Sequence, residues 1–268
     1  MDRAALGSHR LFERYIGIDY SGAGKATDSL SGLRVYLAST GSPPEEVPPP
    51  LGRRRHWSRR EIAGWLLERL RTGPPAVVGI DHGFSFPLAW FECHGLPADW
   101  TSFLEDFHRH WPTDREGVRV EDIRRGRVGD GAARAGDSRW RRLAERRSGA
   151  AKSVFHFDVQ GSVAKSTHAG LPWLLHLRRE LGPRAHFWPF DGWHPGRQCH
   201  VLAEVYPRLC SGRYPTEGRT ADQHDAYSVA AWLRETDAAG ELAALLEPPL
   251  SAAERDTAQI EGWVLGVS

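Results

Sequence analysis

The chain has 268 residues, 40% of them hydrophobic, and its formal net charge at pH 7 is +1. That length provides a substantial core, and it predicts one large domain or a domain with an insertion. A nearly neutral chain has no global field that would by itself require nucleic acid or an anionic membrane as a partner. No apolar run approaches the length of a membrane span, the segment from Met1 to Glu13 lacks the apolar stretch of a signal peptide, and the three cysteines form no CxxC pair. We therefore expect a cytoplasmic protein that makes no contact with a membrane.

The first half of the chain predicts a strand pair. Residues 15–20 are a short apolar run that contains Asp19 and is followed by a Ser-Gly-Ala-Gly turn. A second run at 33–38 lies a short loop away, so the two runs predict an antiparallel hairpin. We expect residues 1–13 to form a flexible N-terminus before a single domain at 14–268.

A helix and a central strand follow a proline-rich loop. Ser58 and Glu61 form a capping box for the helix, whose apolar stripe continues to Leu70. Residues 76–80 are a continuous apolar run that ends at Asp81, and such runs are typical of a central strand covered on both faces. The order of strand, hairpin strand, helix and central strand predicts a mixed α/β sheet flanked by helices.

The segment at about 112–152 differs from the rest of the chain, because it is rich in Arg, Gly and Asp and poor in apolar periodicity. We interpret it as an insertion or a flexible arm. Two roles are open for it: a solvated loop, or an arm whose arginines contact phosphate groups. Its arginines include Arg124, Arg125, Arg127, Arg139, Arg141, Arg142, Arg146 and Arg147.

The second half of the chain alternates predicted strands and helices. The predictions are a strand near 154–158, a turn at 161–170, a helix over 171–181, strands at 185–190 and 200–206, a helix from Ala221 to about Arg234, and a last strand at 259–267.

Three strand-like segments each place an acid in apolar surroundings, and these acids are Asp19, Asp81 and Glu204. A carboxylate at the C-terminal end of a strand faces the crevice in which α/β sheets bind ligands. A charge in that position is costly unless it is paired or bound to a metal. An acid at a strand end can equally cap a loop, so it is the whole set of acids that points to a site.

The helix that begins at Ala221 supplies two more acids. Its apolar stripe, extended one turn backwards, meets Asp222 and Asp225, so both side chains are predicted to face the sheet. Asp222 lies in the first turn, where an acid also stabilises the helix dipole and where Thr220 and Gln223 form a capping box. Asp225 lies deeper, and an acid that faces the core needs a partner.

Together these acids predict a site for a hard divalent cation, because Mg2+ and Mn2+ prefer oxygen ligands of this kind. The sequence contains no HExxH, GxSxG or GxxxxGK[ST] motif, so it gives no support to a zincin, an α/β-hydrolase or a Walker NTPase. We expect Asp19, Asp81, Glu204 and Asp225 to lie on one side of the sheet and to share one or two ions, with Asp222 as a further ligand.

Five segments, in chain order, resemble the domain-of-unknown-function 429 family: YIGIDYSGAG, VVGIDHGFSFPL, AEVYPRL, DQHDAYSVAAWL and EGWVLGV. The resemblance extends from about Tyr15 to Val267 and covers the arginine-rich stretch least. It implies a ribonuclease H-like fold and a nuclease activity, which for the family is itself a prediction. It also implies that the site acids are Asp19, Asp81, Glu204 and Asp225, with Asp222 as a second helix acid. The sequence departs from the family at His82, where an apolar or small residue is commoner.

The leading hypothesis is therefore a metal-dependent nuclease that acts on DNA or RNA. Two ions would activate water and stabilise the leaving oxygen, while Lys165, Arg141 or Arg142 would hold the scissile phosphate. A nucleotide-binding ATPase or kinase of the actin-like class is the alternative, because its related fold also begins with a strand, an Asp and a Gly-rich turn. A non-catalytic protein that binds nucleic acid is the third hypothesis.

Overall fold

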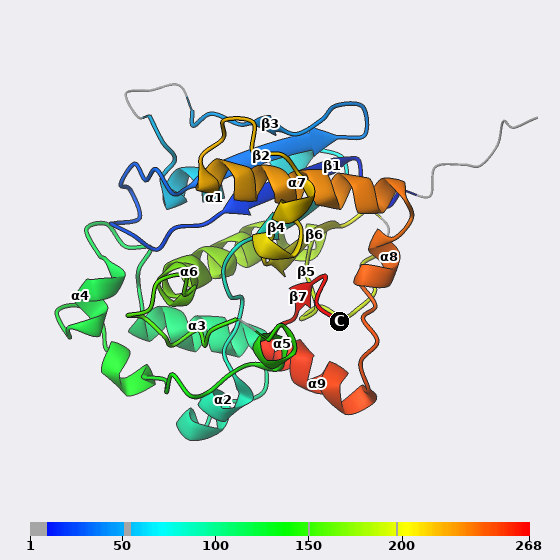
Figure 1. The fold of residues 1–268 in the computed structure, drawn as a ribbon. Coiled ribbons are helices and arrows are strands. Elements are labelled where there is room, and N and C mark those ends of the chain that lie inside the picture. Colours follow the sequence, from blue (N-terminus) through cyan, green and yellow to red (C-terminus); the bar gives the residue numbers. More distant parts are fainter. Residues whose placement is uncertain (1–9, 51–54, 150, 197) are drawn as a thin grey trace, which may run out of the picture.

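The computed structural model describes residues 10–50, 55–149, 151–196 and 198–268. In this part of the chain a mixed sheet carries helices on both faces (Figure 1), which confirms the predicted α/β class. The strands are β1 (Arg14–Asp19), β2 (Arg34–Ser39), β3 (Glu45–Glu46), β4 (Ala76–Ile80), β5 (Ala185–Phe187), β6 (His200–Val205) and β7 (Val264–Leu265). They lie in the order β3-β2-β1-β4-β6-β5, and β7 pairs with β6. β2 is antiparallel to β1, as the predicted hairpin requires, whereas β4, β6, β5 and β7 continue the sheet in parallel.

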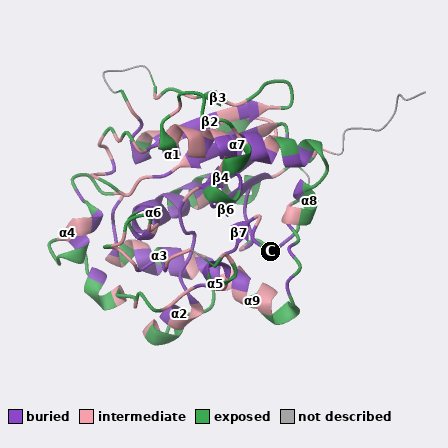
Figure 2. Cartoon of the chain, viewed as in Figure 1, coloured by how far each residue is buried: buried purple, intermediate pink, exposed green. Residues whose placement is uncertain are grey.

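The helices cover the two faces of this sheet. They are α1 (Arg59–Thr72), α2 (Leu88–His94), α3 (Trp100–His110), α4 (Val120–Arg124), α5 (Leu143–Arg147), α6 (Ala164–Leu181), α7 (Ala221–Ala238), α8 (Leu242–Leu245) and α9 (Ala252–Glu261). α7 lies along β1 and β2, whereas α6 packs against α1 and α3 (Figure 1). Buried residues run through the central strands and along much of α6 and α7, whereas exposed residues lie at the periphery of the molecule (Figure 2).

The alternation of side chains along each strand divides the core between the two faces of the sheet. Ile18 and Ile80 belong to the cluster that includes α1 and α6. The side chains of Tyr15 and Val77 point to the other face of the sheet and belong to the cluster that includes Leu233 of α7. All five side chains are at most 2% exposed, and burial of each aliphatic side chain among them stabilises the fold by roughly 1.5–3 kcal/mol.

Small residues let α7 approach the sheet closely. Gly17, Gly79 and Ala203 are neighbours across β1, β4 and β6. A Cβ atom on Gly17 would lie 2.1 Å from the carbonyl oxygen of Ala226, and one on Gly79 would lie 2.7 Å from a valine methyl group of the same helix. Because α7 carries Asp225 immediately before Ala226, this close packing also brings the helix acid to the strand ends.

The sequence predictions for the second half of the chain need three corrections. Residues 154–158 form turns and no strand, although Phe155 is buried against Phe86 with 4.6 Å between the ring centroids. The apolar character of this segment therefore reflects aromatic packing and not strand pairing. The predicted last strand at 259–267 holds the end of α9 and the short β7. α9 begins at a capping box of Ser251 and Glu254, a helix start that the predicted strand does not include.

The third correction concerns α6, which begins at Ala164 and not at 171. Pro172 lies inside this helix, where it cannot donate to the carbonyl of His168 four residues earlier. The hydroxyl of Thr113 donates to that carbonyl instead, at 2.8 Å. A contact from the preceding segment thus replaces the missing helical hydrogen bond, which a reading of local sequence cannot anticipate.

The arginine-rich segment at 112–152 is folded onto the domain in its described part. It contains α4, a 3-10 turn at Gly131–Arg134 and α5. Many of its arginines form ion pairs: Arg124 with Glu121 and Asp158, Arg127 with Asp122, Arg134 with Asp106, Arg139 with Asp137, Arg142 with Glu145 and Glu204, and Arg147 with Glu254. In the described part this segment therefore packs on the domain, and acids of the same domain neutralise the local excess of arginine.

The N-terminal segment is anchored where the structure describes it. The backbone N–H groups of Leu11 and Phe12 donate to the carboxylate of Asp237, at 2.9 and 3.0 Å. The remainder of the predicted flexible N-terminus, 1–9, lies outside the described residues. Among the helices of the described residues, none has the length and apolar character needed to span a membrane.

Candidate functional site

Three aspartates meet at the C-terminal edge of the parallel strands. Asp19 is the last residue of β1, and Asp81 directly follows β4. The N–H of Asp81 donates to the carbonyl of Ile18 at 3.0 Å, so the two strand ends remain in register up to the acids. Asp225 lies in the second turn of α7, next to the close contact with Gly17. All three carboxylates are half-buried.

The environment of these acids opposes their ionisation. Burial raises the pKa of Asp19 to about 9, with further contributions from the charges of Asp81, Asp222 and Asp225. Burial also raises the pKa of Asp81 to about 8, assisted by Asp225 and Glu204, and burial raises the pKa of Asp225. A bound cation would strongly stabilise the ionised form of such a carboxylate, because it would offset both the desolvation and the repulsion by neighbouring acids.

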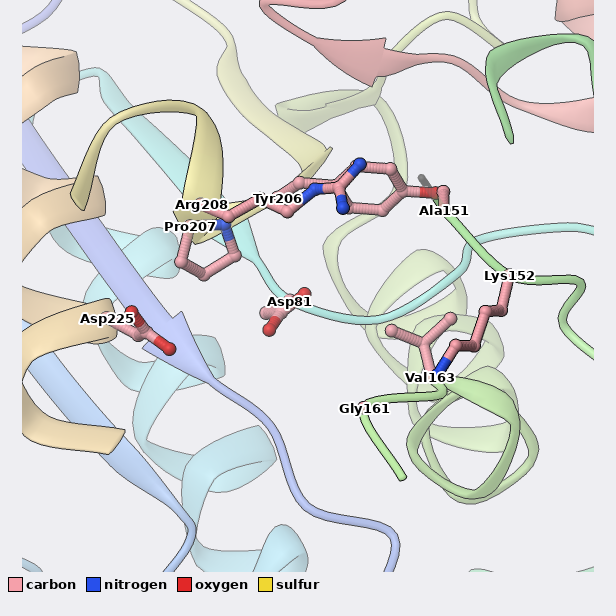
Figure 3. Close-up of a pocket in the computed structure, with 9 residues that line it drawn as sticks. All are labelled: Asp81, Ala151, Lys152, Gly161, Val163, Tyr206, Pro207, Arg208 and Asp225. Carbon is pink, nitrogen blue, oxygen red and sulfur yellow. The ribbon is translucent and has the colours of Figure 1, made fainter. Parts of the chain in front are cut away.

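A pocket of about 180 Å³ opens beside two of these aspartates (Figure 3). Asp81 and Asp225 line it together with two basic residues, Lys152 and Arg208. Tyr206 forms part of the wall, and the guanidinium of Arg208 lies 5.9 Å from the centre of its ring. The other lining residues are Ala151, Gly161, Val163 and Pro207. The pocket therefore combines acids that can bind a cation with cations that can bind an anion.

Glu204 is not part of this group. It pairs with Ile80 in the sheet register, so it has the strand parity of the core on the α1 and α6 face. Its carboxylate is fully buried and accepts from both Nη atoms of Arg142, at 2.7 and 2.6 Å. Burial by itself would lower the pKa of Arg142, but the carboxylates of Glu204 and Glu145 raise it well above its ordinary value. The predicted set of four carboxylates on one side is thus reduced to Asp19, Asp81 and Asp225.

Glu204 instead supports the turn that carries Asp81. Its Oε2 atom accepts from the N–H of Phe84 at 3.0 Å. The N–H of Gly83 donates to the hydroxyl of Thr167 at 2.9 Å. The turn after β4 is therefore held by side chains from β6 and α6, and the two hydrogen bonds from Arg142 hold the Glu204 carboxylate in this position.

The other predicted site residues have different surroundings. Asp222 is half-buried in the first turn of α7, where the capping box of Thr220 and Gln223 is present, and it adds to the repulsion on Asp19. Lys165 is exposed and forms an ion pair with Glu121 at 3.0 Å, outside the pocket lining.

The two predicted phosphate-binding arginines are engaged within the protein. Nη2 of Arg141 donates to the backbone carbonyls of Glu145 and Ala151, at 2.5 and 2.7 Å. Arg142 is 0% exposed and bound to Glu204 and Glu145. Neither guanidinium lines the pocket.

The acids form no complete protein cage for a metal ion in the described part of the chain. Among the described residues, no three His, Cys, Asp or Glu side chains are placed to hold one ion together. Aspartate oxygens nevertheless fit hard cations, and Mg2+ is usually bound by one or two carboxylates together with waters and substrate phosphates. The donor chemistry of Asp81 and Asp225 therefore fits such an ion, with Asp19 adjacent.

Lys152 and Arg208 are not among the site residues predicted from the sequence, although both line the pocket. Lys152 is the last residue of the arginine-rich segment, and Arg208 follows β6 after Tyr206 and Pro207. A basic residue directly after Tyr206-Pro207, at a strand end next to site acids, is the signal that could have identified Arg208.

No protein-family model matches the chain, and neither a curated protein nor a solved structure shows significant similarity to it.

Proposed function

We propose that this chain is a metal-dependent phosphodiester hydrolase, a nuclease of ribonuclease H-like fold, whose site lies at the edge of β1 and β4. One observation carries the proposal: Asp19, Asp81 and Asp225 meet beside a pocket that is also lined by Lys152 and Arg208. The mixed sheet, with an antiparallel hairpin followed by parallel strands, supports the fold assignment.

The acids would hold Mg2+ or Mn2+ through Asp81 and Asp225, with Asp19 as a further ligand. A bound ion of this kind supplies Lewis-acid activation of the phosphate and of an attacking water. The chain contributes the placement of its ligands. Close packing of α7 at Gly17 fixes Asp225, while Glu204 fixes the turn of Asp81.

The basic residues would bind the substrate phosphate. Arg208 and Lys152 lie on the pocket wall with Asp81 and Asp225 (Figure 3). A guanidinium can bind two phosphate oxygens, and an ammonium supplies a compact charge. The proposal assigns the phosphate contact to these two residues in place of Lys165, Arg141 and Arg142, because they lie at the pocket and the other three do not.

Calorimetric titration with Mn2+ and a nuclease assay test this function together. The substrates are single- and double-stranded DNA and RNA with Mg2+ or Mn2+. We expect Asp81→Asn to abolish turnover and to weaken Mn2+ binding at least tenfold, which corresponds to about 1.4 kcal/mol. Asp137→Asn is the matched control, because this acid lies away from the pocket and pairs with the exposed Arg139.

Substitutions of the basic residues separate metal binding from substrate binding. Lys152→Ala and Arg208→Ala are expected to raise KM for a nucleic acid while leaving the affinity for Mn2+ unchanged. Full turnover in Asp81→Asn would refute the proposal. Metal-dependent ATP hydrolysis without nuclease activity would instead favour the actin-like class, and binding of nucleic acid without turnover would favour a non-catalytic protein.

A further inference from the structure

A small internal cavity lies on the face of the sheet opposite to the site acids. Tyr20 follows Asp19, and His82 follows Asp81, so strand alternation directs both rings to the α1 and α6 face. The two rings meet edge to face with 4.5 Å between their centroids. The cavity is lined by both rings, by Arg59 and Ile62 of α1, and by residues of α6 that include Trp173.

Three of the lining side chains have a buried polar atom without a hydrogen-bond partner among the described residues: Oη of Tyr20, Nε of Arg59 and Nε1 of Trp173. Arg59 is 0% exposed, and Tyr20 and Trp173 are each 9% exposed. A buried polar group that lacks a partner costs about 1–3 kcal/mol. Three such groups at one cavity indicate a common partner that the described residues do not supply.

The remaining hydrogen bonds of Arg59 fix the orientation of its guanidinium. Its Nη1 donates to the carbonyls of Ser21 and Ala23, at 3.0 and 2.6 Å, and its Nη2 donates to the carbonyl of Gly24 at 3.2 Å. All three carbonyls belong to the loop that follows Asp19 and Tyr20. Because the guanidinium is planar, these contacts also fix the direction of the Nε–H bond, so this group cannot turn towards another acceptor.

The chemistry of the three atoms defines the ligand. Nε of Arg59 and Nε1 of Trp173 can only donate, whereas the hydroxyl of Tyr20 can donate or accept. The partner must therefore accept two hydrogen bonds and either donate to the hydroxyl of Tyr20 or accept from it. The cavity has about 10 Å³ of space for the centre of a water-sized sphere, close to the roughly 10–15 Å³ that one water requires.

We propose that this cavity is the binding site of one internal water molecule, which accepts from Arg59 and Trp173 and donates to Tyr20. Buried waters typically make about three hydrogen bonds to groups that are otherwise unsatisfied. This water joins α1 and α6 to the loop after β1, directly behind the strand end that carries Asp19. The inference does not depend on the nuclease proposal.

A crystal structure at high resolution and water-selective NMR test the site directly. The expected results are one isolated density peak within hydrogen-bond distance of the three atoms, and a water cross-peak to the indole N–H of Trp173. An empty cavity, or a direct hydrogen bond between Tyr20 and Arg59 that fills the space, would overturn the proposal. So would an anomalous peak in the cavity of bromide-soaked crystals, because the ligand would then be an anion.

A double-mutant cycle tests whether the three groups share one ligand. Tyr20→Phe and Trp173→Phe each remove one contact to the water, so the melting temperature of the double variant should fall by less than the sum of the two single losses. Trp111→Phe is the matched control, because Nε1 of Trp111 is also buried without a partner in the described residues but does not line this cavity. Its combination with Tyr20→Phe should be additive. Additive losses for Tyr20 and Trp173 would contradict a shared water, and the crystal structure decides the matter if either variant fails to fold.

Discussion

Replacement of Arg142 by methionine tests whether the arginine-rich segment is structural. The guanidinium binds both oxygens of Glu204 and one oxygen of Glu145, and all three side chains are 0% exposed. Methionine fills a similar volume but leaves two buried carboxylates without their counter-ion. Removal of one partner from a buried ion pair costs about 3–5 kcal/mol. Each kcal/mol lowers the melting temperature of a chain of this size by roughly 2–4 °C, so we expect a loss of roughly 6–20 °C.

Thermal and urea unfolding at pH 7, followed by circular dichroism, measure this loss. Arg139→Met is the matched control, because the side chain of Arg139 is 88% exposed and pairs with Asp137 at the surface. Exposed ion pairs contribute little to stability, so this variant should melt close to the wild type. Arg142→Lys keeps the charge but cannot bind both oxygens of Glu204, so its melting temperature should lie between those of the wild type and Arg142→Met. If the free energy of unfolding of Arg142→Met lies within about 1 kcal/mol of the wild-type value, the structural role of the buried network is refuted. If that stable variant also loses nucleic-acid binding, the result supports the alternative that the arginine-rich segment contacts phosphate groups.

Three further predictions concern the edge of the sheet and α6. The folded-state pKa of Asp19 is about 9, whereas its ordinary value is 3.8. The protonated side chain therefore makes its full contribution to the free energy of unfolding below about pH 4, and this contribution is lost as the pH rises towards 9. Asp19→Asn, measured without divalent metal, should therefore lose less stability between pH 6 and 9, by up to about 1.4 kcal/mol per pH unit; equal pH slopes would contradict the shift. Gly17→Ala should lower the free energy of unfolding by about 1–3 kcal/mol and weaken Mn2+ binding, because its Cβ would meet the backbone of α7. Gly64→Ala is the control in the same denaturation series, because no atom lies within 4 Å of its Cβ. Thr113→Val should cost about 1–3 kcal/mol in urea unfolding, because the buried carbonyl of His168 loses its donor, and an unchanged midpoint would show that this carbonyl has another partner.

The sequence alone determines most of the sheet. Continuous apolar runs and a capping box correctly predict β1, the antiparallel β2, α1 and β4, because these signals depend on neighbouring residues and on burial that every central strand requires. The same reasoning places Asp19 and Asp81 together, because the C-terminal ends of parallel strands lie at one edge. The apolar stripe of the helix that begins at Ala221 directs Asp225 towards the same sheet.

Tertiary structure decides what each charged residue does. Glu204 resembles Asp81 in the sequence, since both acids lie at the end of an apolar run. Glu204 pairs with Ile80, one residue before Asp81, so its side chain points to the opposite face of the sheet from Asp81. On that face it pairs with Arg142, which lies 62 residues earlier in the chain. Local patterns carry no information on such a pairing, because the energy of a buried charge depends on which opposite charge the folded chain brings within hydrogen-bond distance. The same long-range packing brings Lys152 and Arg208 to the aspartates and places three polar atoms around one cavity.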